Sequence, residues 1–180
     1  MNPRELEEYK ALRATIRQRG TARVWIFVTG VAIWGAMVLA VASLAALPVA
    51  TLLPLVLLAA CFEAIFALHT GVERIGRYLQ VFYEDETATG GVVRNWEHAA
   101  MRFGQAVPGR GADPLFSGLF LIAAVVNFFP AALAGSLPIE YVVIGSAHVV
   151  FIARVLLGRR HAAQQRATDL AAFEKLSTKD

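Results

Sequence analysis

The chain alternates long apolar runs with shorter stretches in which charged residues recur. No Asp, Glu, Lys or Arg occurs in residues 24–62, and residues 114–139 form a second charge-free run. Because about 20 apolar residues cross the hydrocarbon core of a bilayer, the first run is long enough for two spans. Pro48 and Pro54 divide it, since a helix does not easily continue through proline. The pattern predicts a transmembrane hairpin at 24–70.

The second charge-free run begins a second transmembrane hairpin, predicted at residues 114–157. Asp113 followed by Pro114 is typical of a helix start, with aspartate as the N-cap and proline in the first helical position. The Gly-Ser-Leu-Pro sequence at 135–138 predicts the turn between the third and fourth spans. The predicted fold class is therefore an all-α integral membrane bundle with four transmembrane helices and helical extensions.

The segments outside the spans keep a helical period of apolar residues. Residues 1–23 predict an amphipathic N-terminal helix, in which Gly20 is a point for a break or hinge. Residues 71–113 predict a stalk that continues the second span, followed by an amphipathic helix that either lies at the membrane interface or packs under the bundle. Residues 158–180 predict a C-terminal helix.

Composition supports the membrane assignment and excludes several function classes. Of the 180 residues, 57% are apolar and 17% are charged, and Cys61 is the one cysteine. Too little chain remains for a separate catalytic domain, and no disulfide framework is available. Nucleophile arrangements, phosphate-binding glycine loops and dinucleotide fingerprints do not occur in the sequence. We therefore predict a protein that is not an enzyme and has no cofactor.

The basic residues predict the orientation in the membrane. They lie before the first span, between spans two and three, and from Arg154 onward, whereas the other two turns contain none. Because Lys and Arg are retained on the cytoplasmic side, both termini and segment 71–113 are predicted to be cytoplasmic.

Three polar residues fall at a similar depth within the spans. At a helical rise of about 1.5 Å per residue, Glu63, Asn127 and His148 lie roughly 10–15 Å below the outer edge. An unpaired charge in hydrocarbon costs on the order of 3 kcal/mol, so Glu63 needs a partner, water or a proton. Two interpretations are open: a neutral Glu63 bonded to His148 or Asn127 that holds the bundle together, or an ion or proton path through one bundle or a ring of bundles.

A second polar layer is predicted nearer the inner edge, formed by His69, Thr70, Glu73 and Arg154. The i, i+4 spacing of His69 and Glu73 suits a metal ion, but Glu73 can equally pair with Arg77 or Arg154. No Cys/His cluster accompanies them, so no metal site is predicted.

The two basic arms are candidates for contact with an anionic lipid or a nucleotide-type regulator, although the positive-inside rule alone also predicts such arms. The candidate contacts are Arg13, Arg17, Arg19, Arg159, Arg160 and Arg166. Small residues in the first span, among them Gly30 and Gly35, favour close helix contact. Because one four-helix bundle has no room for a water-filled lumen, we predict a homo-oligomer.

Three short motifs resemble a family of small bacterial multi-span membrane proteins. They are EYKALRATIR at 8–17, ERIGRYL at 73–79 and WEH at 96–98. The resemblance implies a multi-pass protein of the bacterial inner membrane. Some proteins with a similar layout are membrane effectors of anti-phage systems that open a pore when a nucleotide-type signal changes.

The sequence thus predicts a homo-oligomeric ion channel or pore-type effector in the lipid bilayer, gated from its cytoplasmic side. The alternative is a non-catalytic accessory or scaffold subunit of a larger membrane complex, with an unknown partner protein.

The predicted topology is tested by placing a cysteine at Ser136, in the turn between spans three and four, in a Cys61→Ala background. A membrane-impermeant maleimide added outside intact cells should label it, because this turn is predicted to face outward. A cysteine at Thr178 is the control and should react only after permeabilisation. Labelling of Ser136→Cys only from inside the cell would contradict the topology.

Overall fold

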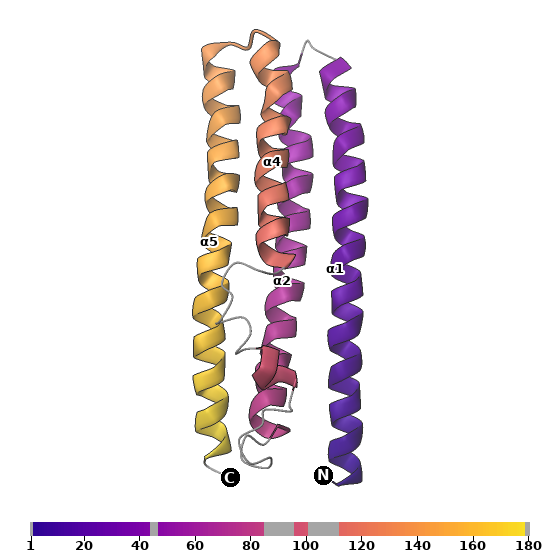
Figure 1. Ribbon diagram of the computed structural model, residues 1–180. Helices are drawn as coiled ribbons and strands as arrows, with labels where there is room; N and C mark the ends of the chain where they lie inside the picture. Colours follow the sequence, from indigo (N-terminus) through magenta and orange to yellow (C-terminus); the bar gives the residue numbers. More distant parts are fainter. Residues whose placement is uncertain (1, 44–46, 85–95, 101–111, 179–180) are drawn as a thin grey trace. The chain divides into compact units, whose positions relative to one another are not determined.

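The computed structural model describes residues 2–43, 47–84, 96–100 and 112–178 (Figure 1). These residues form helices with short connections and no strand, so the predicted all-α fold is confirmed. Four helices are long and apolar enough to cross a membrane, as expected of a multi-pass membrane protein. The elements are α1 (Pro3–Ser43), the 3-10 helix η1 (Pro48–Thr51), α2 (Leu52–Phe82), α4 (Ala112–Leu133) and α5 (Pro138–Ser177).

Helix α1 begins at a reciprocal capping arrangement. The backbone N–H of Glu5 donates to Asn2 Oδ1 at 2.8 Å, and the Glu5 carboxylate accepts from the backbone N–H of Asn2 at 2.7 Å. From there α1 runs without interruption through Gly20 to Ser43, so the predicted hinge at Gly20 is wrong. A single glycine costs a helix about 1 kcal/mol relative to alanine, which the helix-forming residues around it offset.

The prolines divide the first hairpin as predicted, although the boundaries shift. Pro48 opens η1, and Thr51 Oγ1 donates to the Pro48 carbonyl at 2.8 Å. Helix α2 starts at Leu52, so Pro54 lies in its first turn, where the missing proline N–H removes no helical hydrogen bond.

The second hairpin also begins close to its predicted position. Helix α4 starts at Ala112, one residue before the predicted N-cap Asp113, and includes Pro130. Gly135 has φ +67°, a left-handed conformation that glycine adopts without steric cost and that ends the third span. Helix α5 then starts at Pro138.

Residues 158–180 were predicted to form a C-terminal helix of their own. Instead, α5 continues through Gly158 to Ser177. Gly158 is buried, and a Cβ atom there would lie 3.1 Å from both Arg154 Nη1 and the ring of Phe62. The glycine is therefore explained by close packing rather than by helix termination.

The chain divides into two compact units. The spanning unit comprises residues 23–66 and 112–159, and the terminal unit comprises residues 1–22, 67–111 and 160–180. Helices α1, α2 and α5 each contribute residues to both units, and both chain termini belong to the terminal unit (Figure 1).

Aromatic rings fill the centre of the spanning unit. Phe62 of α2 lies 5.5 Å from Phe120 of α4 and 6.3 Å from Phe151 of α5, measured between ring centroids, and all three side chains are buried. Edge-to-face contacts of this kind add to the free energy gained from burial. On α1, Gly30 is buried and lies directly against Cys61 of α2, which allows the two helices to approach closely.

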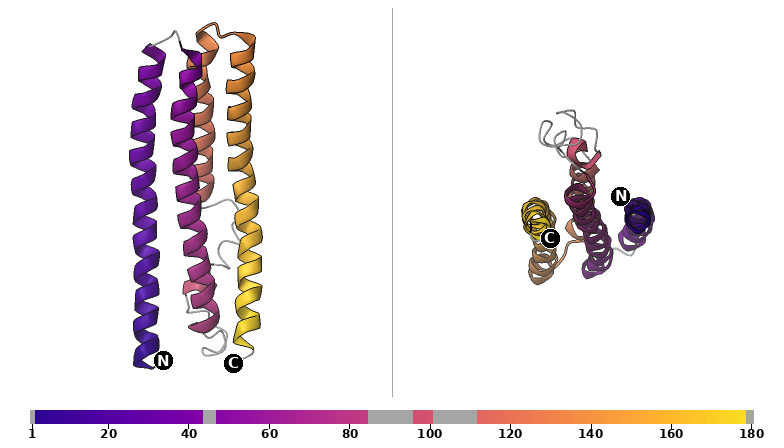
Figure 2. Two further views of the ribbon diagram at one scale, coloured as in Figure 1. Left: turned by 180° about the vertical axis from the view of Figure 1, so that it is seen from behind. Right: turned by 90° about the horizontal axis from the view of Figure 1, so that it is seen from below.

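In the terminal unit, α2 lies between α1 and α5 (Figure 2). Tyr78 of α2 contacts both neighbours: its hydroxyl donates to Glu8 of α1 at 2.9 Å, and its ring centroid lies 5.7 Å from that of Phe173 of α5. The adjacent Leu79 is fully buried. This unit is therefore held by apolar and aromatic packing between three helices.

Candidate functional site

The side chain of Asn127 is a fully buried polar group of the spanning unit. Its Oδ1 accepts from Trp34 Nε1 at 3.2 Å, and its Nδ2 lies 2.9 Å from the carbonyl oxygen of Thr51 and 3.1 Å from His148 Nε2. We call these four residues the Asn127 network. Both amide protons and the amide oxygen have partners, so the side chain joins α1, η1, α4 and α5.

The hydrogen bonds of His148 define its tautomer. Its Nδ1 lies 2.8 Å from the carbonyl oxygen of Ile144, which can only accept, so Nδ1 carries the proton. Nε2 is then free to accept from Asn127. The imidazole is therefore neutral in this arrangement, with both ring nitrogens occupied, and the network holds no polar group ready for a substrate or ion.

Glu63 does not join this network, contrary to the expected contact with His148 or Asn127. Its carboxylate instead forms a two-point ion pair with Arg154 of α5: Oε1 lies 2.7 Å from Nε, and Oε2 accepts from Nη2 at 2.7 Å. The preceding residue, Phe62, faces the core. Successive helical residues point about 100° apart, so Glu63 lies toward the outside of the bundle.

Arg154 also packs against aromatic rings. Its guanidinium carbon lies 5.0 Å from the ring centroid of Phe66 and 5.6 Å from that of Phe62, both suitable for cation–π attraction. Nη1 is buried and has no hydrogen-bond partner among the described residues. Arg154 was predicted to lie in the inner layer because of the position of its Cα along the helix. Its long side chain leans toward the helix N-terminus and therefore reaches Glu63.

The ion pair is half exposed at mid-depth of a candidate span. The side chains of Glu63 and Arg154 are 49% and 35% exposed. Glu63 follows the first residue of α2 by 11 positions, or about 16 Å of helix, which is close to half of a bilayer core of about 30 Å. Exposed side chains on the same helices, such as Val56 and Val150, are apolar.

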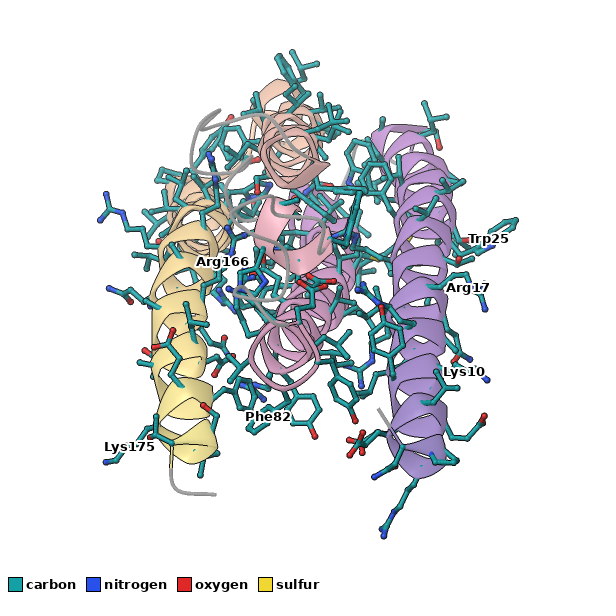
Figure 3. The ribbon with its side chains drawn as sticks, turned by 60° about the horizontal axis from the view of Figure 1, so that its bottom comes forward. Lys10, Arg17, Trp25, Phe82, Arg166 and Lys175 are labelled. Atoms are coloured by element: carbon teal, nitrogen blue, oxygen red, sulfur yellow. The ribbon has the colours of Figure 1, made fainter. Side chains whose placement is uncertain are left out.

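The remaining residues of the predicted inner layer belong to the terminal unit, where Glu73 pairs with Arg166 rather than with Arg77 or Arg154. Arg166 Nε donates to Glu73 Oε2 at 2.6 Å, and His69 Nε2 lies 3.6 Å from the same carboxylate oxygen. Thr70 Oγ1 donates to the carbonyl of Ala67 on its own helix. Figure 3 shows Arg166 reaching from α5 toward α2. Within the described ranges, no group of three or more His, Cys, Asp or Glu side chains is placed to hold a metal ion.

The six arginines predicted to contact an anion have different surroundings. Arg13 pairs with Glu84 at 3.4 Å and Glu97 at 2.6 Å, and Arg19 lies against Gly71. Arg166 is paired with Glu73, as described above. The other three are exposed and have no ion pair with the described residues: Arg17, Arg159 and Arg160. Figure 3 shows Arg17 pointing away from the neighbouring helices of its unit.

A cluster around Glu84 was not predicted. The Glu84 carboxylate, 6% exposed, accepts from the backbone N–H groups of Glu97 and His98 at 3.1 and 3.2 Å, and lies 3.1 Å from His98 Nδ1. It thereby satisfies amides in the first turn of the helical residues 96–100. Gly76 of α2 allows this approach, because a Cβ atom there would lie 2.9 Å from the Glu97 carboxylate.

The sequence gives little signal for this cluster, since the capping carboxylate comes from another helix. Of the amphipathic helix predicted between stalk and third span, only residues 96–100 are among those described. There the polar side chains of Glu97 and His98 face the protein, while Trp96 is 69% exposed.

Comparison of the chain with protein-family models, curated proteins and solved structures finds no match.

Replacing Asn127 by alanine tests the importance of its network. The change leaves Trp34 Nε1, the Thr51 carbonyl and His148 Nε2 without their partner, and we expect a loss of roughly 2–4 kcal/mol in the free energy of unfolding. Unfolding in mixed micelles with increasing SDS measures it. Val125→Ala is the control, because Val125 is exposed on the same helix. Equal stability of the two variants would contradict a structural role for the network.

Replacing Glu84 by glutamine should loosen the 96–100 helical segment from α1 and α2. The amide keeps one acceptor but loses the charge that attracts Arg13 and the two backbone N–H groups, a loss of about 1–3 kcal/mol. Hydrogen–deuterium exchange should show faster exchange at residues 97–100. Glu7→Gln is the control, since Glu7 forms an exposed i, i+3 pair with Lys10. Unchanged exchange in Glu84→Gln would refute the anchoring role.

Proposed function

We propose that the protein is a membrane-embedded, self-associating protein that provides an ion path between protomers and is controlled from its terminal unit. The observation that carries this proposal is the half-exposed ion pair of Glu63 and Arg154 near the middle of a candidate span.

Lipid tails are an unfavourable environment for the ion pair of Glu63 and Arg154. A charged side chain at the centre of a bilayer costs several kcal/mol, and pairing removes only part of that cost. Charged residues within spans therefore usually face other protein or a water-filled path. An interface between copies of the chain, with some water, supplies both.

A path through the centre of one protomer has little support. The rings of Phe62, Phe120 and Phe151 occupy that position, and every hydrogen-bonding group of the Asn127 side chain is already used. The face of α2 and α5 that carries Glu63 and Arg154 offers exposed charge instead. The predicted polar layer of Glu63, Asn127 and His148 is thus divided between an outward-facing ion pair and an internal structural network.

Control from the terminal unit is supported by helix continuity. Helices α1, α2 and α5 run from the terminal unit into the spanning unit without a break, so a rotation or displacement at one end is carried into the spans. The exposed Arg17, Arg159 and Arg160 provide charge for an anionic lipid or a nucleotide-type regulator. The distribution of basic residues supports a cytoplasmic terminal unit, and the family resemblance supports the bacterial inner membrane. The layout shared with some membrane effectors of anti-phage systems supports a role in defence against phage.

The second candidate function is an accessory or scaffold subunit of a larger membrane complex. It is favoured by the fully satisfied Asn127 network, which suits a rigid bundle better than a moving one. In that case a different membrane protein covers Glu63 and Arg154.

Neutralising the ion pair distinguishes the two functions. In planar bilayers containing purified protein, we expect wild-type protein to conduct, and Glu63→Gln or Arg154→Gln to change the conductance roughly fivefold, as removal of an interaction of about 1 kcal/mol implies. Ser146→Ala, an exposed polar position on α5, should conduct like wild type. No current from wild type, together with one stable heteromeric partner after crosslinking in cells, would reject the channel in favour of the accessory subunit.

A further inference from the structure

The spanning unit contains an apolar groove that neither the ion pair nor the Asn127 network fills. It has a volume of about 330 Å³ and lies between α1 and α4, beside η1. Two of its apolar wall residues are strongly exposed, Leu47 at 65% and Leu133 at 84%. The main apolar side chains of the wall are Val38, Val41, Leu47, Phe129, Pro130 and Leu133.

We propose that this groove binds one acyl chain of a membrane lipid. Most of its wall belongs to helices that are long and apolar enough to cross a membrane, with Leu47 and Ala134 in the adjoining turns, so in a bilayer the groove opens toward lipid near the ends of these spans. An apolar cavity of about 150 Å³ stays dry and accepts a benzene-sized molecule, so this groove has room for an apolar group roughly twice as large. A linear acyl chain is the apolar molecule that a bilayer supplies in excess.

The lining also disfavours a charged or strongly polar ligand. Among the described residues that form the groove, Thr51 alone has a polar side chain, and its hydroxyl already donates to the Pro48 carbonyl. No charged side chain is available there to bind a headgroup. The tail of the lipid, rather than its headgroup, is therefore the part that the groove selects.

Occupation of the groove would act on the Asn127 network through Thr51. Thr51 is one of the residues that line the groove, and its backbone carbonyl accepts from Asn127. A chain in the groove fills the space between η1 and α4 and so holds this hydrogen bond in place. This inference does not depend on the proposed function, since it concerns a different face of the protein.

Native mass spectrometry of the full chain, after incubation with phosphatidylethanolamine and transfer to mild detergent, tests the site. We expect one retained lipid per protomer, and an approximately tenfold lower occupancy when Ala42→Leu and Ala134→Leu together fill the groove, corresponding to about 1.4 kcal/mol. Ala40→Leu is the control, because Ala40 is exposed on α1 outside the groove. A retained free fatty acid also supports the proposal; an adduct without an acyl chain, or equal retention by all variants, overturns it.

A second measurement leaves the groove unaltered. Trp34 lies one helical turn from Val38, and the chain has three tryptophans, so Trp25→Phe with Trp96→Phe makes Trp34 the single fluorophore. Vesicles are prepared with increasing amounts of a lipid brominated on its acyl chains. If a chain is bound in the groove, the quenching of Trp34 fluorescence should contain a component that saturates, in addition to the component that rises with the bulk mole fraction of brominated lipid. Quenching that follows only the bulk mole fraction overturns the proposal, even if the filled variant fails to fold.

Discussion

The structure of the spanning unit depends on one constraint: a side-chain amide buried among apolar residues must find all its hydrogen-bond partners within the protein. Asn127 meets it with Trp34, Thr51 and His148, drawn from three other elements of the unit. Apolar packing alone allows helices to rotate and slide, because one apolar contact resembles the next, whereas three directed bonds to one amide define a single arrangement. The edge-to-face phenylalanines around Phe62 then fill the space that this arrangement leaves.

The same constraint separates the two kinds of polar group in the spans. Asn127 and His148 are neutral groups that satisfy each other inside the bundle. Glu63 and Arg154 are charged, and their two-point pair remains half exposed beside the rings of Phe62 and Phe66. A neutral hydrogen-bonded group is buried at little cost, which allows the first pair inside the bundle, whereas a charged pair within a span requires other protein or water around it.

Much of the fold could be predicted from sequence because its strongest signals are local. Pro48 and the Gly-Ser-Leu-Pro sequence at 135–138 predict the two hairpin turns, and Asp113-Pro114 predicts the start of α4, each to within a few residues. The errors arose where distant residues decide the outcome. Gly20 suggested a break or hinge, and the fourth span was expected to end at residue 157, but α1 and α5 continue through these positions, and packing against Arg154 and Phe62 explains Gly158. Depth along the helix indicated that Asn127 and His148 share a layer, but it carries no information on which helix face a side chain occupies, so Glu63 was expected to join them.

The pairs between α2 and α5 restrict how these helices can move. Both helices run in the same direction, and their partners are separated by 91 residues in the spanning unit, for Glu63 with Arg154, and by 93 and 95 in the terminal unit, for Glu73 with Arg166 and Arg74 with Asp169. Within either unit, axial sliding of one helix past the other by one turn, about 5.4 Å, would dissociate the ion pairs of that unit. The pairs therefore oppose piston motions of α2 against α5 in each unit.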